Sequence, residues 1–134
     1  HRKMTMTPCR SMILRTASIS AEKMPTEYID SMIGKPDDKR INILLAHTPK
    51  YMETYMRWGA DLSLSGHYHG GVMRIGKNRG LISPDPSFFP YNAHGYFERE
   101  NRFEIISAGL GEHTIPVRLN NPRELVVAEI FINR

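Results

Sequence analysis

The chain has 134 residues, a length that suits one domain and is enough to bury a core. Its hydrophobic fraction of 40% and charged fraction of 24% are those of an ordinary globular protein. The formal net charge of +4 is spread along the chain and forms no basic stripe with stacking aromatic residues, which disfavours nucleic-acid binding.

Cysteine content and hydropathy exclude further classes. Cys9 is the only cysteine, so a disulfide within the chain and a cysteine-based zinc site are both excluded. No apolar run approaches the ~20 residues that a membrane-spanning helix needs. We therefore expect a cytoplasmic protein, although a membrane anchor upstream of His1 would lie outside this sequence.

The first third of the chain predicts one strand and one short helix. Residues 1–24 carry little pattern apart from a predicted strand over residues 11–17. Residues 26–33 have helical apolar spacing, with Pro25 in front and Gly34 placed to end the helix in the left-handed conformation. A charged loop follows to Arg40.

The best-defined segment is a strand, a helix and a second strand. Residues 41–46 form a short apolar run typical of a strand buried on both faces. Thr48 can cap the next helix, Pro49 suits its first position, and Gly59 can end it. Residues 61–65 then form another strand. This order makes the two strands parallel and places the helix across one face, which predicts an α/β fold.

The rest of the chain predicts strands separated by turns. We expect strands over residues 72–75, 103–107 and 125–131. Residues 76–90 read as a long loop rich in glycine and proline, and we expect this loop and residues 91–102 to shape access to a site.

Three histidines fall where a parallel sheet places its ligand sites. His47 ends the first strand of the strand–helix–strand segment, and His67 and His69 follow the second. The carboxyl ends of parallel strands meet at one edge, so these imidazoles should converge and bind metal. In extended backbone, His67 and His69 would point the same way. Gly70 and Gly71 could offer backbone N–H groups to a substrate phosphate.

Residues 44–49 (LLAHTP) and 59–71 (GADLSLSGHYHGG) resemble the last two metal motifs of the calcineurin-like metallophosphoesterases. Residues 109–111 and 115–118 are similar to the C-terminal region of the bacterial branch with the G-H-x-H-G-G signature. The resemblance covers about residues 41 to 131. It implies that the chain is part of a two-sheet α/β sandwich with αββα layers.

The resemblance also implies a reaction and a role for each histidine. His47 and His67 would bind one of two divalent metals, and His69 the other. The metals would be manganese, iron or zinc, which suit imidazole ligands. A metal-bound hydroxide would then hydrolyse a phosphomonoester or phosphodiester.

The chain departs from the family because the upstream D-x-H, G-D-x-x-D and G-N-H-[DE] motifs are absent. Those motifs would supply the bridging aspartate and the histidine that protonates the leaving group, so no catalytic residue is predicted within residues 1–134. We interpret the chain as the C-terminal portion of one metallophosphoesterase domain without its N-terminal metal-binding half. Alone it should be inactive, and it should pack against the missing half or another chain.

Two other interpretations stay open. The chain could be a non-catalytic metal-binding or interaction module, or a plain α/β domain whose histidines only form hydrogen bonds. Among other candidates, His94 and His113 are expected to be solvated in loops. Arg118 and Arg123 could meet an anionic substrate, with surface salt bridges as the default.

Overall fold

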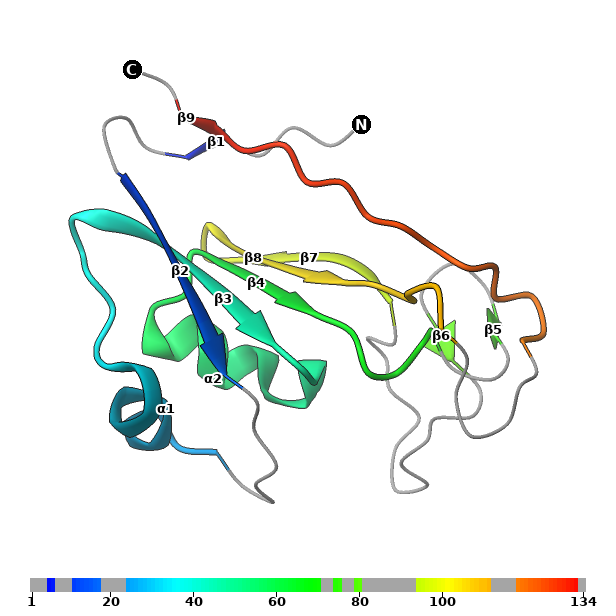
Figure 1. The fold of residues 1–134 in the computed structure, drawn as a ribbon, viewed down its shortest axis with the longest axis horizontal. Helices are drawn as coiled ribbons and strands as arrows, with labels where there is room; N and C mark the ends of the chain where they lie inside the picture. The colour runs from blue at the N-terminus through cyan, green and yellow to red at the C-terminus, as the bar shows by residue number, and fades with distance from the viewer. Residues whose placement is uncertain are drawn as a thin grey trace.

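The computed structural model is a mixed α/β fold built on a five-stranded sheet and two helices (Figure 1). It describes residues 5–6, 11–17, 24–70, 74–75, 79–80, 94–111 and 118–132. The sheet order is β2-β3-β4-β8-β7, and further short strands form two-stranded pairs, β1 with β9 and β5 with β6. The elements are β1 (Thr5–Met6), β2 (Ser11–Ala17), α1 (Thr26–Ile33), β3 (Arg40–Ala46), the 3₁₀ turn η1 (Pro49–Tyr51), α2 (Met52–Trp58), β4 (Leu62–Ser65), β5 (Arg74–Ile75), β6 (Arg79–Gly80), β7 (Gly95–Arg99), β8 (Arg102–Ile106) and β9 (Phe131–Ile132).

Four neighbouring strands of the main sheet, β2, β3, β4 and β8, run parallel, so their carboxyl ends share one edge. The edge strand β7 runs antiparallel to β8. Glu100 and Asn101 join these two strands with φ values of 51° and 61°, the backbone that a type I′ hairpin turn requires. Because β7 is antiparallel, its first residue lies at the same edge as the carboxyl ends of the others.

Both helices cover one face of the sheet, as Figure 1 shows. The core on this face combines Leu44 and Ala46 of β3 with Ile29 of α1 and with Tyr55 and Trp58 of α2. The Trp58 indole also donates a 2.9 Å hydrogen bond to the Asp30 carboxylate, which ties α2 to α1. The helices have 8 and 7 residues, and within the described residues no helix could cross a membrane.

The opposite face of the sheet is apolar but less fully covered. Its buried residues are Ile41, Ile43, Leu62 and Phe103, and Ile130 packs against them from the C-terminal segment. Leu14 stands beside Ile43 in the neighbouring strand but is 62% exposed. This face therefore carries apolar surface that the described part of the chain leaves open to solvent.

The predicted elements before Gly66 are confirmed, and later ones are less accurate. The strand over residues 11–17, the helix over residues 26–33 and the parallel strand–helix–strand segment are all present. Gly34 ends α1 with φ 77° and ψ 174°, so its φ is positive but its backbone is not left-handed helical.

One prediction for the second half is wrong. Residues 125–131 were expected to form a strand, but only Phe131–Ile132 is a strand in the structure. Residues 125–130 have no neighbouring strand to pair with in the described chain. Residues 95–99 form β7, a strand that was not predicted, and the expectation that residues 91–102 shape access to a site stays a prediction. The prediction for residues 72–75 is confirmed for Arg74–Ile75, and residues 72, 73, 76–78 and 81–93 lie outside the described residues.

Candidate metal centre

Two of the three predicted histidines lie next to each other at the carboxyl edge of the sheet. His47 directly follows β3, and His67 follows β4, the adjacent parallel strand. Their ring centroids are 4.4 Å apart, with the rings inclined at 50°. The Gly66 N–H donates a 3.3 Å hydrogen bond to the His47 carbonyl, which holds the two loops together. His47 is exposed and His67 half-buried, so a ligand can reach the pair from solvent.

Hydrogen bonds with η1 and α2 restrain the loop that carries His47. The Thr48 hydroxyl accepts a 3.3 Å hydrogen bond from the Lys50 N–H, as predicted for a helix cap. The buried Tyr55 hydroxyl donates to the Thr48 carbonyl at 2.8 Å. Burial raises the pKa of Tyr55 far above its usual value, with a smaller contribution from the nearby Glu104. Tyr55 therefore stays a neutral donor and restrains the backbone beside His47.

The strand that leads to His67 is fixed by a buried carboxyl group that the sequence analysis missed. Glu104 of β8 is 0% exposed, and its Oε1 accepts a 2.5 Å hydrogen bond from the Ser65 hydroxyl while Oε2 accepts one from Ser63. Burial raises the pKa of Glu104 to about 7, although both serine hydrogen bonds act to lower it. A glutamate in the middle of an apolar strand was the signal that could have identified it.

The H-x-H segment is not extended, contrary to the expectation from sequence. His67 and His69 have φ values of 64° and 48°, in the left-handed region. Residues other than glycine seldom adopt this conformation, and strained backbone of this kind is concentrated at functional sites. The buried Asn121 side chain donates a 2.6 Å hydrogen bond to the His69 carbonyl and so stabilises this conformation.

His69 lies beside a different segment from His67. A Cβ atom on Gly111 would lie 4.0 Å from Cε1 of His69, so this ring sits against the turn after β8, while the His67 ring sits against His47. Gly70 is buried with φ 72°, a backbone that favours glycine. Gly71, the other residue predicted to contact substrate, lies outside the described residues.

The metal-ligand roles stay a prediction. Within the described ranges, no group of three or more His, Cys, Asp or Glu side chains is arranged to hold a metal ion. The structure thus brings His47 and His67 together without completing a metal site from these ranges. Imidazole nitrogens are suitable ligands for manganese, iron or zinc, so the chemistry of the pair fits the predicted metals.

A second polar cluster follows β8 at the same edge. His94 Nε2 lies 2.8 Å from Glu124 Oε1, and the other Glu124 oxygen accepts a 3.0 Å hydrogen bond from the Ala108 N–H. The His94 side chain is only 17% exposed, so the expectation of a solvated His94 is wrong. His113, the other expected loop histidine, lies outside the described residues.

Comparison with known proteins finds relatives that include two proteins named as metallophosphoesterases. The chain is 28% identical to the uncharacterized metallophosphoesterase YkuE of Bacillus subtilis over 110 residues, 73% of this chain and 37% of that protein. It is 30% identical to an uncharacterized metallophosphoesterase of Helicobacter pylori strain J99 over 105 residues, 77% of this chain and 27% of that protein. It is also 32% identical to the uncharacterized protein YpbG of Bacillus subtilis over 104 residues, 77% of this chain and 36% of that protein.

The chain is similar to metallophosphoesterases over most of its length. It spans about a third of the curated relatives that it matches. No protein-family model matches it, and no solved structure does.

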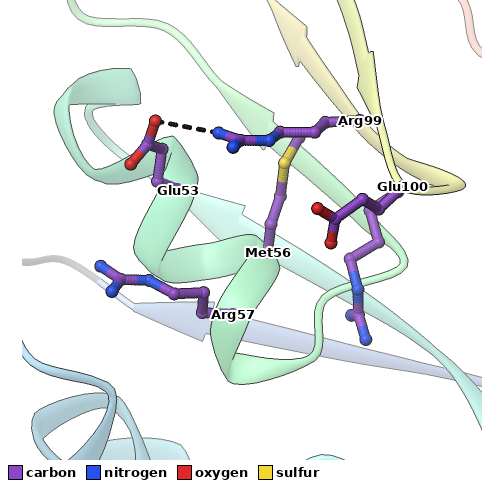
Figure 2. A pocket seen from close by; sticks show the side chains of 6 residues that line it. Glu53, Met56, Arg57, Arg99 and Glu100 are labelled. Carbon is purple, nitrogen blue, oxygen red and sulfur yellow. Dashed lines mark hydrogen bonds and ion pairs between the residues drawn. The ribbon is translucent and has the colours of Figure 1, made fainter.

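A groove between α2 and the β7–β8 hairpin lies away from the histidines. It has a volume of about 410 Å³ and is lined by Glu53, Met56, Arg57, Arg99, Glu100 and Arg102. Figure 2 shows the 3.1 Å ion pair between Arg99 and Glu53 that crosses it. Both side chains are more than 60% exposed, and such pairs contribute little stability. Because the hairpin turn lies at the amino end of β8, this groove is no part of the histidine edge.

Proposed function

We propose that this chain is part of a calcineurin-like metallophosphoesterase that hydrolyses phosphomonoesters or phosphodiesters with two divalent metal ions. The observation that carries the proposal is the 4.4 Å contact between the His47 and His67 rings at the ends of adjacent parallel strands. The similarity to proteins named metallophosphoesterase supports it. In this proposal His47, His67 and His69 are metal ligands, and Gly70 and Gly71 face the substrate phosphate.

The residues present fit part of a metal site. Neutral imidazoles suit manganese, iron or zinc, but carboxylates are needed to offset the charge of two divalent ions. We propose that this chain is part of a longer protein, as its relatives are longer than the matched region, and that those carboxylates lie in the remaining part. The metal ions would polarise the phosphate and lower the pKa of a coordinated water. The chain's own contribution is to hold three imidazoles on loops fixed by Tyr55, Glu104 and Asn121.

The same longer protein would cover the open face of the sheet. Leu125 and Val127 are 76% and 80% exposed in an extended segment, and Leu14 is 62% exposed on the sheet. Apolar surface of this kind marks a contact with other protein. We propose that a second sheet, from the rest of the protein or from another chain, packs there to complete an αββα sandwich.

The test is metal analysis of the full-length protein. Wild type should carry about two ions per chain, and His67→Ala should lose at least one of them together with most phosphoesterase activity. His94→Gln is the matched control, because His94 lies at the same edge but contacts Glu124 instead of His47. Wild type and His67→Ala with equally little metal would contradict the proposal. Full metal loading without hydrolysis of any phosphoester would favour a non-catalytic metal-binding module.

A further inference from the structure

A second polar pocket adjoins the H-x-H segment on the side of His69. It has a volume of about 550 Å³ and is lined by Arg118, Asn120, Asn121, Pro122 and Arg123. Among the described residues that line it, two carry a guanidinium group, two carry an amide and none carries a carboxylate. Its lining therefore has positive charge and hydrogen-bond donors, which is the chemistry that recognises anions.

Arg118 is held in place by carbonyl groups. Its guanidinium donates to the carbonyl oxygens of Ala108 at 3.1 Å and Pro122 at 3.4 Å, and also to that of Gly111. In the described part of the chain it forms no ion pair with a carboxylate, and the nearby Glu124 carboxylate binds His94 and the Ala108 N–H. The charge of this half-buried guanidinium is thus fixed in position, and no acidic side chain of the described residues pairs with it.

Two contacts connect this pocket to the H-x-H segment. Asn121, one of its lining residues, is 3% exposed and donates to the His69 carbonyl at 2.6 Å. Gly111, whose carbonyl accepts from Arg118, lies beside the His69 ring. An anion bound by Arg118 and Arg123 would therefore lie beside His69 of the predicted metal centre.

We propose that this pocket binds a second anionic group of the substrate. The inference rests on the proposed phosphoesterase function and narrows its substrate class to phosphoesters that carry a further phosphate or carboxylate. The metal-binding edge would hold the phosphate that is hydrolysed, and Arg118 and Arg123 would hold the other anion. The planar fork of arginine suits both groups.

The kinetic test compares two chromogenic substrates in the full-length protein. In the first, one sugar hydroxyl of thymidine is joined to para-nitrophenol through a phosphodiester. The second is the same compound with a phosphate added to the other sugar hydroxyl. Wild type should have the higher kcat/KM for the ester with the added phosphate, and Arg123→Gln should lower that preference by about 10-fold. Arg118→Lys, which keeps the charge but not the fork, should lower it by a smaller factor. Arg57→Gln, an exposed arginine of the groove beside α2, is the control and should leave the preference unchanged.

A binding measurement separates this inference from the proposed function. Calorimetry can measure the affinity of the metal-depleted protein for thymidine bisphosphate. Relative to wild type, Arg123→Gln should bind it about 10-fold more weakly, and Arg57→Gln should bind it equally well. If His67→Ala removes metal and activity while Arg123→Gln changes neither the preference nor this binding, the pocket is wrong and the function stands. If Arg123→Gln weakens binding of inorganic phosphate but not the substrate preference, the pocket serves free phosphate and the inference is contradicted.

Discussion

Individual residues at the carboxyl edge have backbone conformations that side chains and close contacts stabilise. His67 and His69 have positive φ values, and Asn121 holds the carbonyl of the latter. Sequence reasoning correctly placed His47 and His67 at one edge, because strand order and crossover direction follow from the strand–helix–strand pattern. It wrongly expected extended backbone at the H-x-H segment, because the stabilising contact comes from residue 121, far along the chain.

Gly59 offers the sharpest stability prediction at this scale. It ends α2 with φ 119°, and a Cβ atom there would lie 2.7 Å from Cγ of Pro36. Gly59→Ala should therefore lower the free energy of unfolding by more than about 1 kcal/mol in urea denaturation. Gly109→Ala is the matched control, since Gly109 has φ 66° but no atom within 4 Å of the added Cβ. Equal losses in both variants would show that steric contact with Pro36 is not the cause.

At the scale of elements, β4 and β8 are joined by a buried polar contact as well as by the sheet. Ser63 and Ser65 of β4 both donate to Glu104, beneath α2. This contact holds the strand that ends at Ser65, directly before Gly66 and two residues before His67. Both strands were predicted from the sequence, but the pairing of a glutamate with two serines depends on the register of strands about 40 residues apart.

The buried carboxyl group gives the protein a specific pH dependence. Burial raises the pKa of Glu104 from 4.5 to about 7, so the folded state binds this proton more tightly than the unfolded state. Its contribution to stability is then fully present below pH 4.5 and is lost as pH rises through 7, by up to a few kcal/mol. The Glu104→Gln variant should lack this slope, so the difference between the wild-type and variant unfolding free energies should change between pH 4.5 and pH 7.

The control for this measurement is Glu98→Gln on the neighbouring strand β7, where the carboxyl group is exposed. Its unfolding free energy should follow that of wild type across the same pH range. A Glu104→Gln protein with the full wild-type pH dependence would show that another group titrates.

In the described part of the molecule, one face of the sheet is well packed and the other is less fully covered. The helix-covered face could be predicted from sequence, because the apolar spacing of both helices and the apolar run of β3 are local patterns. The role of residues 118–132 could not, because residues 125–127 form no strand despite their strong strand propensity. A strand needs a neighbour, and the sequence alone does not say whether one is present.

Val127 tests whether that face is covered in the proposed longer protein. It is 80% exposed here, so Val127→Lys in the isolated chain should change the free energy of unfolding by no more than about 0.5 kcal/mol. In the full-length protein the same change should cost more than about 2 kcal/mol, because it would bury an unpaired charge. Asp38→Lys, at an exposed turn, should be near-neutral in both. A near-neutral Val127→Lys in the full-length protein would contradict the two-sheet sandwich.

The account depends most on metal ions at the edge where β3 and β4 end. The most direct measurement is anomalous X-ray diffraction from crystals of the full-length protein grown with manganese or zinc. We predict an anomalous peak about 2.1 Å from a ring nitrogen of both His47 and His67, and a second peak nearby that contacts His69. Well-ordered histidine rings with no anomalous peak beside them would contradict the account.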